Sequence, residues 1–180
     1  YKRQEPSPEP HRIALAKGRN SIQKFFTPDV KSFLKYENYD LITFTNSFPH
    51  IPSPVETLKL ASQLIDRKNG IICIESPSAE LMLREGQFDQ IYHQHMLYLD
   101  PVSVNNLCEM VDLSLNKITQ TSFHNGSIRY YISHRNSAHK KSDSLVDYIN
   151  SKKMSGYLTS QLDEEFKTKS LENRTSIRNL

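Results

Sequence analysis

Residues 40–77 read DLITFTNSFPHIPSPVETLKLASQLIDRKNGIICIESP, and this stretch decides the fold. Two short apolar runs, residues 40–45 and 71–74, have hydrophobic side chains on both faces and are typical of buried strands. They flank a segment whose apolar residues have helical spacing. A strand, a helix and a second strand in this order predict a βαβ unit in a mainly parallel sheet that is covered on both sides.

The helix between the two strands carries signals for both of its ends. It starts at Ser53-Pro54, because Pro suits the first helical position, where no backbone N–H is needed. Ser53 and Glu56 have the spacing of a capping box. Asn69-Gly70 then predicts the end of the helix.

The same combination of a small polar residue and Pro predicts further helices on either side. It recurs at Ser7-Pro8, Thr27-Pro28 and Asp100-Pro101. Towards the carboxyl end, residues 113–119 and 128–133 are predicted strands joined by a turn at Asn125-Gly126. A closing pair of strands with a short connection indicates an antiparallel edge.

The composition changes near residue 137, where Ser, Lys, Asn and Asp become frequent and no strand follows. Two weak helical stripes remain: Leu145, Tyr148 and Ile149, then Leu158, Leu162 and Phe166. We therefore predict a domain over residues 1–136 and a helical connector over residues 137–180.

Length and composition exclude several classes of protein. With 180 residues, 37% of them hydrophobic, the chain allows one ordinary domain. The net charge is only +3 and the charges are interspersed, so no nucleic-acid partner is expected. No apolar run is long enough to span a membrane, and the polar start at residues 1–5 is not a signal peptide.

The two cysteines, Cys73 and Cys108, both lie in apolar runs and are predicted to be small buried hydrophobic residues. Without a CxxC pair they do not provide the ligand set of a structural zinc site. Nothing indicates secretion, so we expect a reducing, cytoplasmic location.

Ligands of open α/β sheets bind beyond the carboxyl ends of the strands, and polar residues stand at four such places, the last of which is residues 88–98. Glu5 can accept hydrogen bonds from ribose hydroxyls, or it is an ordinary exposed acid. Asn46 and His50 follow the strand at residues 40–45, and His50 has either a structural or a catalytic role. Glu75 follows the next strand and contacts a ligand or holds a loop.

Residues 88–98, FDQIYHQHMLY, contain the densest cluster of titratable and aromatic groups. In extended backbone His93 and His95 face the same way, which would suit a metal, but no further ligand cluster accompanies them. Proton transfer suits histidine better, because an unperturbed histidine has a pKa of about 6.5. We therefore expect no metal site.

In order, these motifs resemble those of the sugar C-methyltransferases, which are class I S-adenosylmethionine-dependent enzymes acting on nucleotide-linked keto sugars. The resemblance covers residues 3–170. Its motifs here are Glu5-Pro6-Ser7, Phe25-Phe26, Asp40 through Asn46 to His50-Ile51, Glu75-Ser76-Pro77, Phe88 to Tyr98, and His124-Asn125-Gly126-Ser127-Ile128-Arg129. It implies a Rossmann-like sheet, mostly parallel with an antiparallel last strand.

The resemblance also implies the reaction. A base removes the proton beside a sugar ketone, and the enolate carbon attacks the methyl group of the cofactor. It implies that His95 is the base and that Tyr92 and His50 hydrogen-bond to the keto group or polarise it.

The other roles that it implies concern binding. Glu5 and Asn46 would bind the cofactor, and Gln94, Ser127 and Arg129 would hold the sugar or its nucleotide phosphates. For Ser127 and Arg129, a strand-edge salt bridge is the structural alternative.

Three departures from the family pattern stand out. Gln94 replaces a Glu, so any carboxylate role at that position is lost. Asn125 replaces the first glycine of an H-G-G-S motif, which suits Asn because it tolerates positive φ. The first strand, its glycine-rich cofactor loop, the amino-terminal zinc module and the carboxy-terminal domain are expected outside this chain, which alone is expected to bind the cofactor poorly.

These departures leave two other functions open. One is a catalytically degenerate remnant that binds a nucleotide sugar or a partner. The other is O- or N-methylation on the same scaffold, because a fold does not fix the chemistry.

Overall fold

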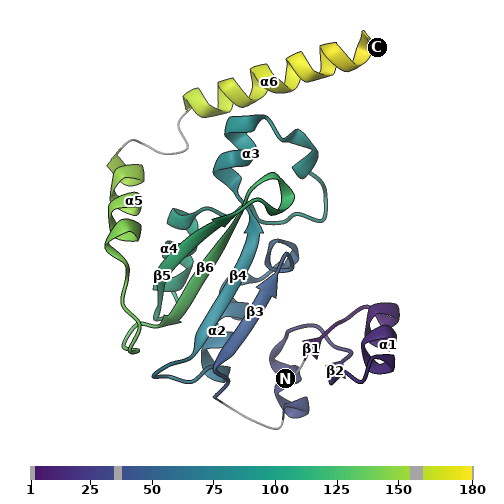
Figure 1. Cartoon of the computed structure of the whole chain (residues 1–180), viewed down its shortest axis with the longest axis vertical. Helices are drawn as coiled ribbons and strands as arrows, with labels where there is room; N and C mark the ends of the chain where they lie inside the picture. Colours follow the sequence, from purple (N-terminus) through teal and green to yellow (C-terminus); the bar gives the residue numbers. More distant parts are fainter. Residues whose placement is uncertain (1–2, 35–37, 155–159, 180) are drawn as a thin grey trace.

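The computed structural model describes residues 3–34, 38–154 and 160–179, which form two small sheets with helices around them (Figure 1). The strands are β1 (Arg3–Gln4), β2 (Ser21–Ile22), β3 (Leu41–Thr45), β4 (Ile71–Pro77), β5 (Leu113–Thr121) and β6 (Ser127–His134). The α-helices are α1 (Pro8–Ala16), α2 (Pro54–Leu64), α3 (Ala79–Glu85), α4 (Pro101–Glu109), α5 (Asp143–Met154) and α6 (Ser160–Arg178).

The main sheet has the strand order β3-β4-β6-β5. β3 and β4 are parallel, whereas β6 is antiparallel to both β4 and β5. β3, β4 and β5 therefore run in one direction and only the last strand runs against them, which confirms the predicted strand directions. The closing pair also forms the predicted antiparallel edge, in which β6 inserts between β4 and β5 and β5 is the edge strand.

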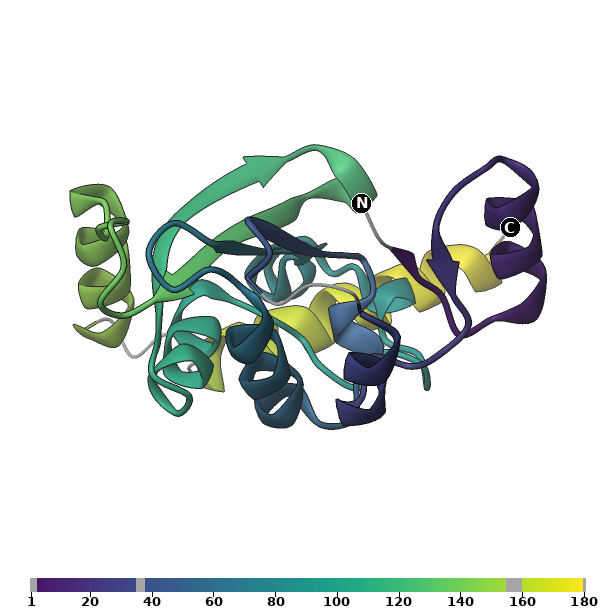
Figure 2. The same ribbon diagram turned by 90° about the horizontal axis from the view of Figure 1, so that it is seen from below.

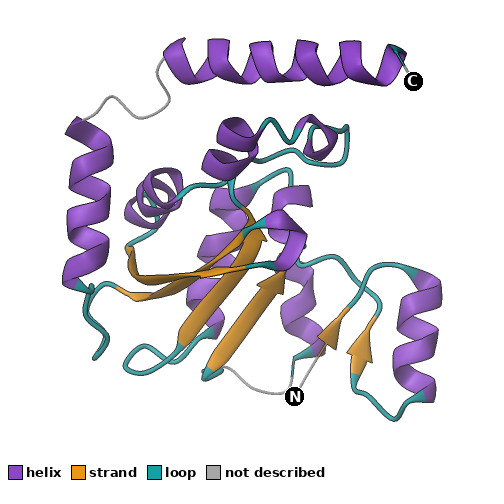
Figure 3. Cartoon of the chain, turned by 45° about the horizontal axis from the view of Figure 1, so that its top comes forward, coloured by secondary structure: helices purple, strands orange, loops and turns teal. Residues whose placement is uncertain are grey.

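β1 and β2 form a separate parallel pair, with α1 beside them. This small sheet lies to the side of β3 (Figures 1 and 3). Among the described residues, no strand pairs with the outer edge of β3 or joins the two sheets.

Only one face of the main sheet is fully covered. Figure 2 shows α2 and α4 on the same side of the strands. Side chains of that face form the hydrophobic core with these helices: Ile72, Ile74, Leu115, Tyr130 and Ile132 pack with Leu58, Ala61, Val104 and Cys108. On the other face Leu41 is 56% exposed, and Thr43 and Thr45 are exposed. The prediction of a sheet buried on both faces is therefore wrong for β3.

The helix ends show which of the capping patterns form. The Asp100 carboxylate accepts hydrogen bonds from the backbone N–H groups of Val102 and Ser103, at 2.7 and 3.1 Å, and α4 begins with a complete capping box. The predicted capping box at Ser53 is absent, because the Ser53 side chain caps no N–H and Glu56 pairs with Lys59.

Two other helix predictions also need correction. After Thr27 the chain forms a short 3-10 helix, Pro28–Phe33, rather than an α-helix. α2 ends at Leu64 and not at Asn69-Gly70, because Asp66 accepts hydrogen bonds from the backbone N–H groups of Lys68 and Asn69 and so holds a turn there.

The two carboxy-terminal helices pack in different places. Leu145 and Ile149 of α5 are buried in the core of the main sheet, and the Tyr148 hydroxyl donates to Glu80 of α3 at 2.6 Å. α6 packs against α3 and buries Leu162, whereas Leu158 lies outside the described residues. The boundary after residue 136 stays a prediction. In the described ranges, no helix is long and apolar enough to cross a membrane.

Candidate active site

The carboxyl ends of β3 and β4 carry the predicted catalytic side chains. η2 (Phe48–His50) follows β3, and the loop of residues 91–98 reaches it from beyond β4 and α3. Phe48 is completely buried and packs edge-on against Phe44, with ring centroids 5.5 Å apart. This anchor fixes the short helix that presents His50.

The loop of residues 91–98 is tied to η2 by backbone hydrogen bonds. The N–H groups of Met96 and Leu97 both donate to the Pro49 carbonyl, at 2.9 and 3.2 Å. The ring centroids of His50 and His95 are consequently 5.0 Å apart, although the residues are distant in the sequence. We call His50, Tyr92 and His95 the histidine–tyrosine cluster.

Backbone carbonyls fix the tautomer of both histidines in their neutral form. Nδ1 of His95 lies 2.9 Å from the Gln90 carbonyl oxygen, and Nδ1 of His50 lies 2.8 Å from that of Gln94. A carbonyl only accepts, so each Nδ1 must carry the proton. Each Nε2 then presents a lone pair, which is what a general base requires.

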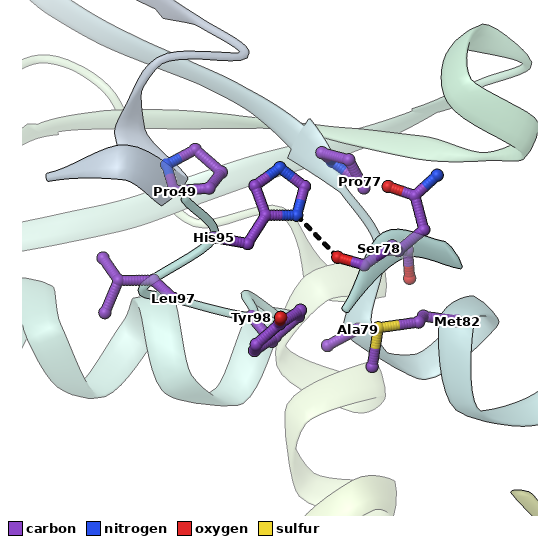
Figure 4. Close-up of a pocket in the computed structure, with 9 residues that line it drawn as sticks. Pro49, Pro77, Ser78, Ala79, Met82, His95, Leu97 and Tyr98 are labelled. Atoms are coloured by element: carbon purple, nitrogen blue, oxygen red, sulfur yellow. Dashed lines mark hydrogen bonds between the residues drawn. The ribbon is translucent and has the colours of Figure 1, made fainter. Parts of the chain in front are cut away.

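The lone pair of His95 is already engaged. The Tyr92 hydroxyl lies 2.8 Å from Nε2 of His95, and the two rings are stacked at a tilt with centroids 4.1 Å apart. Figure 4 shows the His95 ring between Pro49 and Pro77, with the hydrogen bond of its Nδ1 drawn as a dashed line. The structure thus brings together all three predicted catalytic residues.

A pocket lies between the ends of β3 and β4 and the hairpin that joins β5 to β6. Its volume is about 650 Å³. We call it the hairpin pocket, and its lining residues are Thr45, Asn46, Glu75, Thr121, Ser122, Phe123, His124, Asn125 and Arg129.

Two residues that line the hairpin pocket each have a polar side-chain atom without a partner among the described residues. These are Oδ1 of Asn46 and Oγ1 of Thr121, both buried. Asn46 itself has a φ of 50°, and its backbone N–H donates to the Glu75 carbonyl at 2.9 Å. A buried polar atom that lacks a partner is costly, so a ligand that donates to Asn46 would be favoured.

Arg129 and Glu75 form an ion pair across neighbouring strands at the floor of the hairpin pocket. The Arg129 side chain is half exposed and the carboxylate of Glu75 is buried. The hydrogen bond to Glu75 raises the pKa of the Arg129 guanidinium above its ordinary value. Arg129 therefore makes a salt bridge, as the structural alternative predicted, but between two inner strands and not at an edge of the sheet. Substrate contact at Arg129 stays a prediction.

Ser127 holds the hairpin. It is fully buried, and its hydroxyl donates to the Phe123 carbonyl at 2.9 Å. This geometry supports a positioning role rather than direct contact with a substrate. Asn125 has a φ of 55°, so the expectation that Asn replaces glycine here at positive φ is confirmed.

The remaining predicted residues lie away from these contacts. The Gln94 side chain is exposed, and only its backbone carbonyl takes part in the cluster. Glu5 follows β1 in the small sheet and is not brought to the histidine–tyrosine cluster.

The Glu5 carboxylate accepts from Arg3 at 3.0 Å and from the Ser7 backbone N–H at 3.1 Å. Partial burial alone would raise the pKa of Glu5, but the hydrogen bonds from Ser7 and Arg3 outweigh it and lower the pKa. Each carboxylate oxygen keeps a second lone pair for a ribose hydroxyl.

Sequence reasoning missed the groups that orient the cluster. The Gln90 and Pro49 carbonyls belong to the backbone and leave no side-chain signal. Thr121 lies just beyond the predicted strand at residues 113–119, where only the hairpin geometry reveals its position in the pocket.

Comparison with known proteins identifies the family. A model of the methyltransferase domain family matches residues 4–118, which is more than half of the chain. The chain belongs to this family.

A curated relative is the C-methyltransferase NovU of Streptomyces niveus, which is 25% identical over 170 residues. The match covers 93% of this chain and 40% of NovU, so the chain spans less than half the length of this relative.

Solved structures of methyltransferases share the fold. The magnesium protoporphyrin IX methyltransferase of Synechocystis PCC 6803, with bound SAH, gives a TM-score of 0.55 at 10% identity, covering 74% of this chain and 63% of that one. A possible histamine N-methyltransferase of Thermotoga maritima gives 0.56 at 17% identity, covering 72% and 71%. The predicted Rossmann-like methyltransferase fold is confirmed.

Proposed function

We propose that this chain carries the methyl-transfer site of an S-adenosylmethionine-dependent C-methyltransferase that acts on a nucleotide-linked keto-deoxysugar. The observation that carries the proposal is the histidine–tyrosine cluster at the carboxyl ends of β3 and β4. The Nδ1 protons of its histidines are fixed by carbonyls, which leaves a lone pair on each Nε2, and the lone pair of His95 accepts a hydrogen bond from Tyr92. The name of NovU and the motifs quoted above support transfer to carbon.

The residues of the chain also fit the cofactor. Ribose hydroxyls are hydrogen-bond donors, and Asn46 and Glu5 provide acceptors for them, one of which has no partner among the described residues. When bound, S-adenosylmethionine supplies an electrophilic methyl group. Asn46 and Glu5 would hold and orient it, which lowers the barrier by positioning.

In the proposed reaction the cluster removes the proton from the carbon beside the ketone. The negative charge that develops on the ketone oxygen needs a donor close by. Nδ1 of His50 is held by the Gln94 carbonyl, so its Nε2 donates to that oxygen only when the ring is protonated. Arg129, at the floor of the hairpin pocket, would hold the sugar phosphates.

The location and the partner are part of the proposal. Both cysteines are free thiols, in agreement with a reducing cytoplasmic environment. The substrate we propose is a nucleotide sugar.

The test is the rate of methyl transfer from labelled S-adenosylmethionine to nucleotide-linked keto-deoxysugars, measured with the polypeptide that carries this chain. We expect His95→Asn to lower kcat by about 10²–10⁴-fold, the usual contribution of general acid–base catalysis. Calorimetric titration with S-adenosylhomocysteine should give the same affinity for both proteins. A binding remnant would instead bind the sugar and transfer no methyl group in either form.

A further inference from the structure

A chain of hydrogen bonds runs from the backbone through His95 to Tyr92. The Gln90 carbonyl accepts from Nδ1–H of His95, and Nε2 of His95 then has only a lone pair to offer. The Tyr92 hydroxyl, 2.8 Å away, must therefore be the donor to Nε2. The positions of both protons in this series of hydrogen bonds follow from which atoms can only accept.

This arrangement blocks the basic nitrogen. The phenolic oxygen of Tyr92 occupies the position from which a carbon acid would approach Nε2 of His95. His95 is partly buried between Pro49 and Pro77 (Figure 4), whereas Tyr92 is 41% exposed. Tyr92 is thus the outward end of the pair and His95 the inner end.

We propose that Tyr92, and not His95, takes the proton from the substrate carbon, and that it passes its own proton to His95 in the same step. This inference rests on the proposed function and names the acting group of its site. Tyr92 is then the catalytic residue that touches the substrate, and His95 is the residue that positions and activates it.

The step balances as follows. The C–H bond beside the ketone breaks and a new O–H bond forms on Tyr92, while the original O–H bond of Tyr92 breaks and an N–H bond forms on Nε2 of His95. The electron pair of the C–H bond passes into the enolate. The products are a neutral tyrosine, an imidazolium on His95 and the enolate, and the net charge is unchanged.

The Gln90 carbonyl supports this transfer. Its oxygen faces Nδ1–H at 2.9 Å, so its dipole stabilises the imidazolium that forms and keeps the ring oriented. In this state Tyr92 donates to His95 and not to the ketone. Of the three residues in the cluster, only His50 could still donate to the enolate oxygen, and it does so only when its ring enters the reaction protonated, since its Nδ1–H is held by the Gln94 carbonyl.

The experiment measures exchange of the hydrogen beside the ketone in D₂O. It uses the polypeptide that carries this chain, with S-adenosylhomocysteine present so that no methyl group is transferred. The probes are nucleoside-diphosphate-linked keto-deoxysugars. Tyr92→Phe should slow exchange by about 10²-fold or more with KM unchanged within about threefold. Tyr131→Phe, which removes a phenol on β6 outside the cluster, should leave the rate unchanged.

Two further variants test whether Tyr92 and His95 act as one unit. The double variant Tyr92→Phe/His95→Gln should be no slower than either single variant, because residues that act together are not additive. In His95→Gly, added imidazole should restore exchange by about tenfold, and this rescue should disappear when Tyr92→Phe is also present.

The outcomes separate the two proposals. If Tyr92→Phe retains the exchange rate, or if imidazole rescues His95→Gly without Tyr92, then His95 takes the proton directly and the relay is wrong. If the unsubstituted protein binds the sugars but exchanges no hydrogen, the proposed function fails and the relay fails with it.

Discussion

The two faces of the main sheet are built from alternate residues of the same four strands, yet they differ in burial and in polarity. On the covered face Ile72, Ile74, Tyr130 and Ile132 are fully buried against the helices. On the other, which we call the open face, the residues in register with one another include Thr45, Glu75 and Arg129. The open face carries the floor of the hairpin pocket.

The comparison separates stability from function. Burial of apolar side chains on the covered face stabilises the fold by roughly 25 cal/mol per Å². The open face contributes less burial and instead holds an ion pair, a partly exposed thiol and exposed threonines. We therefore expect substitutions on the covered face to affect folding and those on the open face to affect mainly the pocket.

The largest expected effect is on the covered face. Ile74 is completely buried beside Phe44 and Tyr130 in the strand register. Ile74→Ala should lower the free energy of unfolding by about 3 kcal/mol, because it removes buried methylenes and leaves a cavity. Urea denaturation measures this, with Thr43→Ala on the open face as the control. An equal loss in both variants would contradict the difference between the faces.

The two cysteines give an intermediate effect. Burial raises the pKa of the Cys108 thiol to about 12, so the thiol stays protonated at pH 8. Cys108 is also completely buried beneath the covered face, where a reagent in solution does not reach it. Burial also raises the pKa of Cys73, which is nonetheless partly exposed. Iodoacetamide should label Cys73 at least about 10²-fold faster than Cys108.

Mass spectrometry of the folded protein gives both labelling rates. In concentrated urea the two rates should agree within about threefold, because the protection of Cys108 comes from the fold. Labelling of Cys108 as fast as Cys73 in the folded protein would show that the covered face is open to solvent.

A smaller effect is expected from the ion pair on the open face. Arg129→Ala leaves the buried carboxylate of Glu75 without its partner, so the urea midpoint should fall, but by less than in Ile74→Ala. Adding Glu75→Gln to Arg129→Ala should recover part of the loss, because the uncompensated charge is removed. A double variant less stable than Arg129→Ala would show that the pairing does not control stability here.

The fold was largely predictable because its strands and helices have strong local signals. The runs at residues 40–45 and 71–74 became β3 and β4, and the Asp100 cap formed. The position of β6 between β4 and β5 depends on pairing between strands that are distant in the sequence, and the local pattern of residues does not predict such pairing. The open face of β3 escaped prediction for a related reason, since an apolar run does not reveal which face is covered.

The site was predictable in its side chains and not in its geometry. His50, Tyr92 and His95 were expected to act together, and the structure brings them into contact. Their orientation depends on the backbone carbonyls of Gln90, Gln94 and Pro49. Every residue type has such a carbonyl, so the sequence does not show which ones orient the cluster. Ser127 was expected at the substrate, but the packing of the hairpin buries it.

The position of the transferred methyl group tests the central proposal most directly. The polypeptide that carries this chain would be incubated with ¹³C-methyl-labelled S-adenosylmethionine and nucleotide-linked keto-deoxysugars, and the products examined by NMR. We expect the label on the sugar carbon next to the ketone, and its loss in His95→Asn. A label found on oxygen or nitrogen, or one that His95→Asn leaves unchanged, would contradict carbanion chemistry at the histidine–tyrosine cluster.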